Sequence, residues 1–138
     1  MLTLFHDYTS AASAVAVLRL QRLADEGLAV AFAGFEALGV DTALPVTLDV
    51  VAGVDDLATA AAAEGLELRR PPLLPPTARA HVLGTLAEDV GLGASWRQAC
   101  YAAFWTSGAD LADPPVLAEL GATAGLDRDA VAAALADR

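Results

Sequence analysis

Cysteine is nearly absent from this sequence, because Cys100 is the only one among 138 residues. Dithiol–disulfide exchange within one chain needs two thiols, so the chain cannot carry out this chemistry by itself. A structural zinc site needs a cluster of Cys and His residues, and the sequence offers no such cluster around Cys100, so no metal is predicted. Cys100 stands among apolar residues in the middle of a predicted helix, which is typical of a buried filler rather than a reactive thiol.

Basic residues are also scarce, with eight against 18 acidic ones and a net charge of −10. Such a charge repels phosphate backbones and anionic lipid headgroups, so we predict neither nucleic acid nor membrane partners. No apolar run approaches the ~20 residues that span a bilayer. The first ten residues, MLTLFHDYTS, contain no basic segment of the kind that opens a secretory signal. We therefore expect a cytoplasmic location.

The length predicts a single domain over residues 1–138, and the apolar fraction of 56% includes much alanine, which favours helices. Residues 2–6 alternate as a strand does, residues 11–26 have helical spacing, and residues 28–34 form a nearly continuous apolar run. This order predicts a βαβ unit with two parallel strands and a right-handed crossover.

The second part of the chain is predicted to be mainly helical. A third strand is expected at residues 45–51, followed by a helix over 54–64 and an extended proline-rich connector over 69–76. Residues 1–52 would then form the βαβ part and residues 53–138 a helical subdomain. The expected helices of the subdomain lie at about 77–90 and 94–107, from Pro114 to Gly125, and from Asp127 to the C-terminus.

Three stretches resemble motifs of one known family in their order and spacing. They are residues 7–13 (DYTSAAS), residues 75–81 (PPTARAH) and the run from Ala102 to Asp127. Together they resemble the DsbA-like branch of the thioredoxin fold, which includes oxidoreductases and 2-hydroxychromene-2-carboxylate isomerases. The resemblance implies an α/β fold, with a thioredoxin-like βαβ unit and an inserted helical subdomain.

The resemblance also implies where a ligand would bind. Redox members carry Cys-x-x-Cys at the junction of the first strand and helix, whereas glutathione-dependent members carry a serine at the first position. Ser10 and Ser13 stand there in this sequence. This implies binding of glutathione or a small acidic organic molecule, with Ser10 as the catalytic contact of an isomerase-like activity and no covalently bound cofactor. The implied ligand-binding residues, with Asp7 and Tyr8 as the polar tip of the site, are Asp7, Tyr8, Thr9, Ser10, Ser13, Pro76 and Thr77.

Elementary chemistry permits two interpretations of Ser10. The N-terminus of a helix presents free N–H groups and about +0.5 of a charge, which suits a bound thiolate or carboxylate. The alternative is an ordinary N-cap, which stabilises its helix by about 1 kcal/mol. A nucleophilic serine would need a base, and the two histidines, His6 and His81, are both expected to be structural.

Members of the family continue with two antiparallel strands and a helix that this sequence lacks, so the first strand is expected to have an open edge. An open edge is a liability that proteins cover or pair. Residues 45–51 could fold back as a substitute strand, or the edge could pair with a second copy, and we favour a homodimer. The second functional hypothesis is therefore a non-catalytic interaction module that completes its sheet with another chain.

Overall fold

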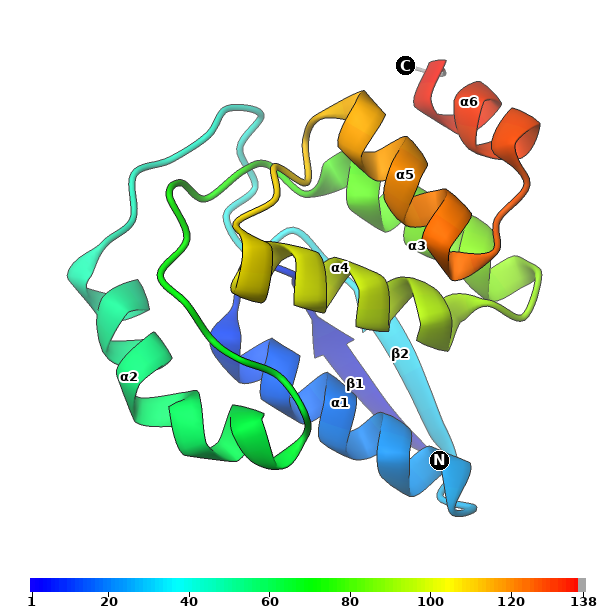
Figure 1. Ribbon diagram of the computed structural model, residues 1–138. Coiled ribbons are helices and arrows are strands. Elements are labelled where there is room, and N and C mark those ends of the chain that lie inside the picture. The colour runs from blue at the N-terminus through cyan, green and yellow to red at the C-terminus, as the bar shows by residue number, and fades with distance from the viewer. Residues whose placement is uncertain (137–138) are drawn as a thin grey trace.

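Two parallel strands joined by a helix open the chain in the computed structural model, which describes residues 1–136 (Figure 1). Strand β1 covers Leu2–His6, helix α1 covers Ala11–Asp25 and strand β2 covers Val30–Gly34. The two strands pair from Leu2 opposite Val30 to His6 opposite Gly34. The βαβ unit predicted from the sequence is therefore confirmed, and so is the α/β fold class.

The predicted third strand at residues 45–51 is wrong, because helix α2 covers Leu48–Ala63. Thr47 caps this helix, and its hydroxyl accepts a hydrogen bond from the N–H of Val50 at 3.5 Å. The residues that α2 packs inward follow helical spacing, with Val54 and Ala61 buried and Val50 and Leu57 partly buried. The alternating residues at 45–51 thus belong to the cap and the first turn of a helix.

Helix α2 begins six residues before the predicted start at 54 and runs across the predicted division between residues 52 and 53. The segment before it does not serve as a substitute strand beside β1. Instead, Leu44 and Leu74 exchange two backbone hydrogen bonds of 2.8 Å each in an isolated antiparallel bridge. This bridge ties the segment before α2 to the proline-rich connector.

Within residues 1–136 four helices follow the connector, as predicted, while the expected end of the last helix at the C-terminus lies outside the described residues. They are α3 (Ala78–Asp89), α4 (Gly93–Ser107), α5 (Pro114–Ala124) and α6 (Arg128–Ala136). Figure 1 shows α4 lying across α1 and beside α5, with α3 behind α5. Gly125 ends α5 at φ +93°, a left-handed conformation that glycine adopts without steric cost.

Helix α4 supplies the centre of the core. Trp96, Cys100, Tyr101, Phe104 and Trp105 are each at most 1% exposed, because other elements pack on more than one side of this helix. The placement of Cys100 in the core, as expected from its neighbours, is confirmed. Over residues 1–136, none of the helices combines the length and hydropathy needed to cross a membrane.

The two-stranded sheet is covered unequally. Leu4 and His6 share one face of β1, where Leu4 packs against the core and His6 is buried. Phe5 points to the opposite face and is 65% exposed. Within the described residues β1 pairs only with β2, so its other edge is open, as predicted.

Candidate functional site

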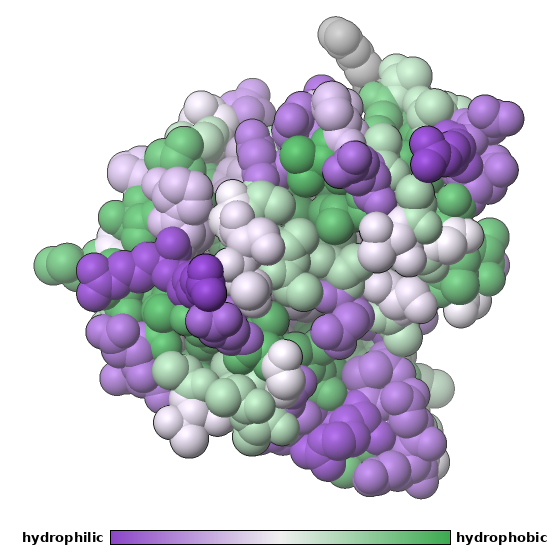
Figure 2. Space-filling view, in the orientation of Figure 1, coloured by the Kyte–Doolittle hydropathy of each residue, from purple (hydrophilic) through white to green (hydrophobic). Residues whose placement is uncertain are grey.

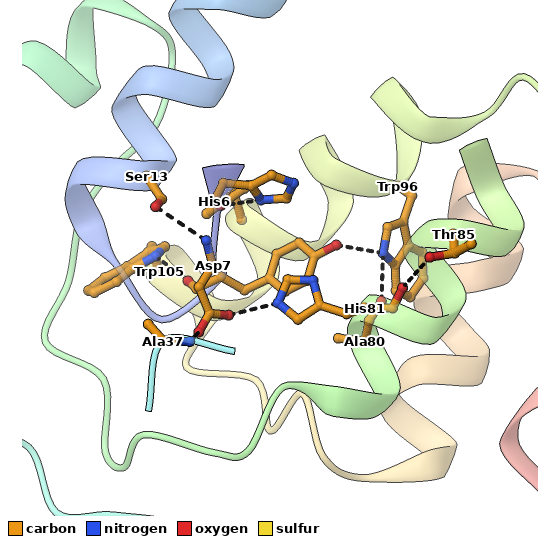
Figure 3. A network of polar contacts seen from close by, with 11 residues as sticks. His6, Asp7, Ser13, Ala37, Ala80, His81, Thr85, Trp96 and Trp105 are labelled. Carbon is orange, nitrogen blue, oxygen red and sulfur yellow. Dashed lines mark hydrogen bonds and ion pairs between the residues drawn. The ribbon is translucent and has the colours of Figure 1, made fainter. Parts of the chain in front are cut away.

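Ser10 is the N-cap of α1, directly after β1. Its hydroxyl oxygen accepts a hydrogen bond from the backbone N–H of Ser13 at 3.1 Å. The hydroxyl of Ser13 in turn accepts from the backbone N–H of Asp7 at 3.3 Å (Figure 3). The predicted strand-to-helix hinge at residues 7–13 is therefore confirmed, and both serines help to close it.

A shallow cleft of about 250 Å³ lies in front of this helix terminus. We call it the Ser10 cleft; its lining includes Thr9, Ser10, Asp49, Val50, Gly53, Leu57 and Trp105. Among the described residues, the hydroxyl hydrogen of Ser10 has no acceptor, so Ser10 can donate to a ligand while it caps the helix. Asp49 adds a negative charge from the first turn of α2.

Asp7 lies beneath the surface at the end of β1 and is 1% exposed. One carboxylate oxygen accepts from the N–H of Ala37 at 2.7 Å, and the other lies 2.9 Å from Nε2 of His81 (Figure 3). Burial alone would raise the pKa of this carboxyl, but hydrogen bonds from His81, Ala37 and Thr77 outweigh burial, so its pKa lies below the usual value. Asp7 is therefore ionised at neutral pH.

His81 comes from the first turn of α3 and is held on several sides. Because Asp7 is a carboxylate, Nε2 of His81 carries the hydrogen of their contact, so in the neutral imidazole Nδ1 is the acceptor. The ring stacks on that of Tyr8, with centroids 4.6 Å apart. Gly34 of β2 makes room for the ring, because a Cβ atom at this position would overlap Nδ1.

His6 is a buried histidine of the core, 3% exposed, and its Nδ1 lies 2.9 Å from the hydroxyl of Tyr101. Burial, as the largest cause, together with His81 and Arg97 lowers the pKa of His6 to about 4. His6 is therefore neutral at pH 7. This position agrees with the structural role expected from the sequence.

A second cleft, of about 360 Å³, opens between β2, α3 and α4. We call it the His81 cleft; its lining includes His6, Tyr8, Phe32, Gly34, His81, Gly84, Thr85, Glu88, Asp89, Trp96 and Arg97. The guanidinium of Arg97 lies 4.0 Å above the centre of the Phe32 ring and bonds Glu88 at 2.7 Å. The sequence carried no signal for this use of Arg97, since it is a single basic residue in a largely apolar helix.

The structure distributes the predicted site residues over several places. Thr9 and Ser10 line the Ser10 cleft, with Ser13 one turn further along α1. Tyr8 lines the His81 cleft and is 1% exposed. Thr77 is buried beside Asp7, and Pro76 lines a third, open hollow next to residues 39–42. Asp7 and Tyr8 thus lie inside the molecule. Asp49, which lines the cleft beside Ser10, was not predicted from the sequence.

No disulfide is present, and no cluster of His, Cys, Asp or Glu among residues 1–136 could hold a metal ion.

Figure 2 shows hydrophilic side chains gathered over the C-terminal part of α1. On α1, Arg19 and Arg22 both bond Glu64 of the segment after α2, at 3.1 and 2.9 Å. This ion-pair cluster lies apart from both clefts.

Comparison with known proteins identifies what the fold resembles. The family model described as a DSBA-like thioredoxin domain matches residues 1–138. A crystal structure of a probable DsbA oxidoreductase from Streptomyces coelicolor is similar with a TM-score of 0.82 and 26% identity, over 98% of this chain and 67% of that chain. A structure of 2-hydroxychromene-2-carboxylate isomerase is similar with a TM-score of 0.76 and 21% identity, over 100% of this chain and 72% of that one. No curated protein sequence matches significantly.

Proposed function

Because this chain belongs to the DSBA-like thioredoxin domain family, we propose that it is a member without redox cysteines that binds glutathione or a small acidic organic ligand in the Ser10 cleft. The observation that carries the proposal is the hydroxyl of Ser10. It caps α1 as an acceptor and keeps its own hydrogen free to donate into the cleft. The resemblance places Ser10 where redox members carry their first cysteine, so the proposed site differs from theirs in chemistry.

The electrostatics of the Ser10 cleft suit a ligand with charges of both signs. The N-terminus of α1 favours a thiolate or a carboxylate, by about 0.3–1 kcal/mol at an exposed site. Asp49 at the wall of the cleft suits an ammonium group. Glutathione carries a thiol, two carboxylates and an ammonium, so it can satisfy both ends of the cleft.

The proposed role of Ser10 is to donate a hydrogen bond to the sulfur of the bound ligand. Such a donor favours the thiolate form, which is the nucleophilic form of a thiol. In an isomerase-like activity the thiolate would be the reacting group and Ser10 its positioning contact. Disulfide reduction is not part of the proposal, because Cys100 is the only thiol and it is fully buried.

Calorimetric titration of the chain with glutathione tests the proposal. The native protein should bind glutathione and should bind S-methylglutathione, which has no thiol, more weakly. The variant Ser10→Asp keeps an acceptor that caps α1 but replaces the hydroxyl by a negative charge, so it should lose binding without losing the helix. Ser107→Ala, an exposed serine at the end of α4, is the matched control. Equal binding by native protein and Ser10→Asp would contradict the proposal.

The second candidate function is that of an interaction module that completes its sheet with a second copy of the chain. The backbone groups of Leu2 and His6 bond β2, so the groups of Thr3 and Phe5 face the open edge of β1. Phe5 and Leu2 are 65% and 48% exposed beside this edge. An apolar strand with an unpaired edge favours association, and a two-fold axis lets one β1 pair with the other.

Sedimentation velocity at micromolar concentration tests the second candidate. It predicts a dimer that Phe5→Lys converts to a monomer, because a lysine at a strand edge opposes pairing. Leu48→Lys is the control, since Leu48 is 86% exposed but lies on α2, away from β1. A native monomer would exclude this candidate, whereas a dimer with full glutathione binding would be compatible with both.

A further inference from the structure

The pair of Asp7 and His81 has the geometry of an oriented base. Asp7 holds Nε2 of His81 at 2.9 Å, and the N–H of Ala37 fixes the other oxygen of the same carboxylate. Within residues 1–136, Nδ1 of His81 makes no hydrogen bond. A carboxylate that orients one ring nitrogen and leaves the other as an acceptor is the arrangement that general bases share.

The surroundings keep the imidazole in one position. Tyr8 stacks on one side of the ring, and the hydroxyl of Tyr8 is itself fixed by the indole N–H of Trp96 at 3.1 Å. Gly34 leaves the space that Nδ1 occupies. A histidine that served only to fill space would not need a buried carboxylate, because burying a charge costs free energy unless the charge has partners.

The charges that face His81 determine which ligand the cleft can accept. Asp7 lies behind the ring as a carboxylate, and His6 is neutral at pH 7. On the wall of the cleft, Arg97 is paired with Glu88, and Asp89 adds a further negative charge. The carboxylate of Asp89, beyond the paired charges of Arg97 and Glu88, disfavours an anion, so we take the ligand to bind in an uncharged form.

The shape of the cleft points to a small and flat ligand. Its volume of about 360 Å³ is at the lower end of the range for small-molecule sites. The ring of Phe32 forms part of its wall, and the space beside Gly34 and Gly84 is filled by the side chains of His81, Tyr8 and Trp96. None of the residues that line the Ser10 cleft takes part in this wall.

We propose that the His81 cleft is a second ligand site, separate from the Ser10 cleft, for a small, flat, uncharged molecule that donates an N–H or O–H to Nδ1 of His81. The site goes beyond the function proposed for Ser10 and does not depend on it.

Two small probes that differ in a single donor test this proposal. 1,2,4-Triazole is flat, uncharged and carries an N–H, whereas 1-methyl-1,2,4-triazole lacks that hydrogen. Titration of each probe is followed by NMR through the ring signals of His81. The triazole should shift these signals saturably and bind at least about 10-fold more tightly than its methylated form, as expected for one hydrogen bond in a partly buried site.

The variant His81→Gln separates the ligand role from a structural one. Its amide nitrogen can replace Nε2 and keep the bond to Asp7, but it offers nothing at the position of Nδ1. For this variant the triazole shifts are followed on the backbone N–H signals of Gly34 and Gly84. We expect the fold to persist and triazole affinity to fall about 10-fold, to the level of the methylated probe. Val82→Ala, an exposed neighbour on α3, should bind the triazole as the native chain does.

Three results would overturn the proposal: no triazole binding to the native chain, equal binding of both probes, or undiminished binding by His81→Gln. Saturating glutathione should leave triazole binding unchanged, because the two clefts share no lining residues. Loss of triazole binding in the presence of glutathione would contradict a separate site. A failure of glutathione binding alone would affect only the function proposed for Ser10.

Discussion

The indole N–H of Trp105 donates a hydrogen bond of 2.9 Å to the backbone carbonyl oxygen of Tyr8, although the two residues are 97 positions apart in the chain. Trp96, on the same helix, donates to the hydroxyl of Tyr8 at 3.1 Å. Helix α4 thus holds both the backbone and the side chain of Tyr8, the residue that joins β1 to the Ser10 hinge. The helical part of the chain thereby sets the geometry of both clefts.

The first prediction concerns this link. Trp105→Phe keeps an aromatic ring in the core but removes the donor and leaves the buried carbonyl of Tyr8 without its partner. We expect the free energy of unfolding to fall by about 1–3 kcal/mol, measured by chemical denaturation. An unchanged denaturation midpoint would show that the Trp105 bond does not hold the junction.

The second prediction uses the buried His6. Its pKa is lowered from 6.5 to about 4 in the folded chain, so the unfolded chain binds a proton more readily. The stabilisation is fully present above pH 6.5 and is lost as the pH falls toward 4, by up to about 3 kcal/mol. In His6→Asn the amide takes the place of Nδ1 in the bond to Tyr101 and cannot titrate. The free energy of unfolding of this variant, measured by chemical denaturation, should therefore change less over this pH range than that of the native chain. If the free energy of unfolding changed equally with pH in both proteins, the buried neutral state of His6 would be contradicted.

The third prediction concerns the contribution of the Glu64 carboxylate to stability at acidic pH. Hydrogen bonds from Arg22 and Arg19 lower its pKa from 4.5 to about 2 in the folded chain, and its side chain is only 4% exposed. A lowered pKa of an acid contributes stability above pH 4.5 that is lost as the pH falls toward 2. The stability difference between the native chain and Glu64→Gln should therefore shrink in acid. Glu67→Gln is the control, because the pair of Glu67 with Arg69 is exposed on both sides and contributes little.

The fourth prediction tests the helix terminus at Ser10 with a thiol. In a Cys100→Ala background, Ser10→Cys should react with iodoacetamide faster than Ala62→Cys and at a lower pH, because the N-terminus of α1 stabilises a thiolate. Ala62 is exposed in the last turn of α2, where the helix end disfavours a negative charge. The native Cys100 should be labelled slowly, since it is fully buried and burial raises its pKa. Similar rates and similar pH profiles for the two new thiols would contradict the prediction.

The parts of the fold that the sequence predicted well depend on local signals. The hinge at Ser10, the capped helices and the glycine that ends α5 are each specified by residues close together in the chain. The error at residues 45–51 arose because seven residues are too few to distinguish the two-residue period of a strand from the 3.6-residue period of a helix. Alternation suggested a strand, while the cap at Thr47 and the inward positions of Val54 and Ala61 belong to a helix. Only the longer segment decides between them.

The contacts of the two clefts could not be predicted from the sequence. Asp7 meets His81 across 74 positions, and His6 meets Tyr101 across 95. The pairing depends on how α3 and α4 pack against the end of β1, which no local pattern states. The resemblance placed residues 7–13 and 75–81 in one region but did not indicate that Asp7 would be buried as the partner of a histidine.

The most direct test of the proposed function is to map the glutathione site by NMR on the isotope-labelled native chain. The account predicts that glutathione shifts the backbone N–H signals of Ser10, Ala11 and Ala12 and of Asp49 to Gly53, all around the Ser10 cleft. It also predicts that the signals of Gly34 and Gly84 in the His81 cleft stay in place. Shifts confined to the His81 cleft, or no shifts at saturating glutathione, would contradict it.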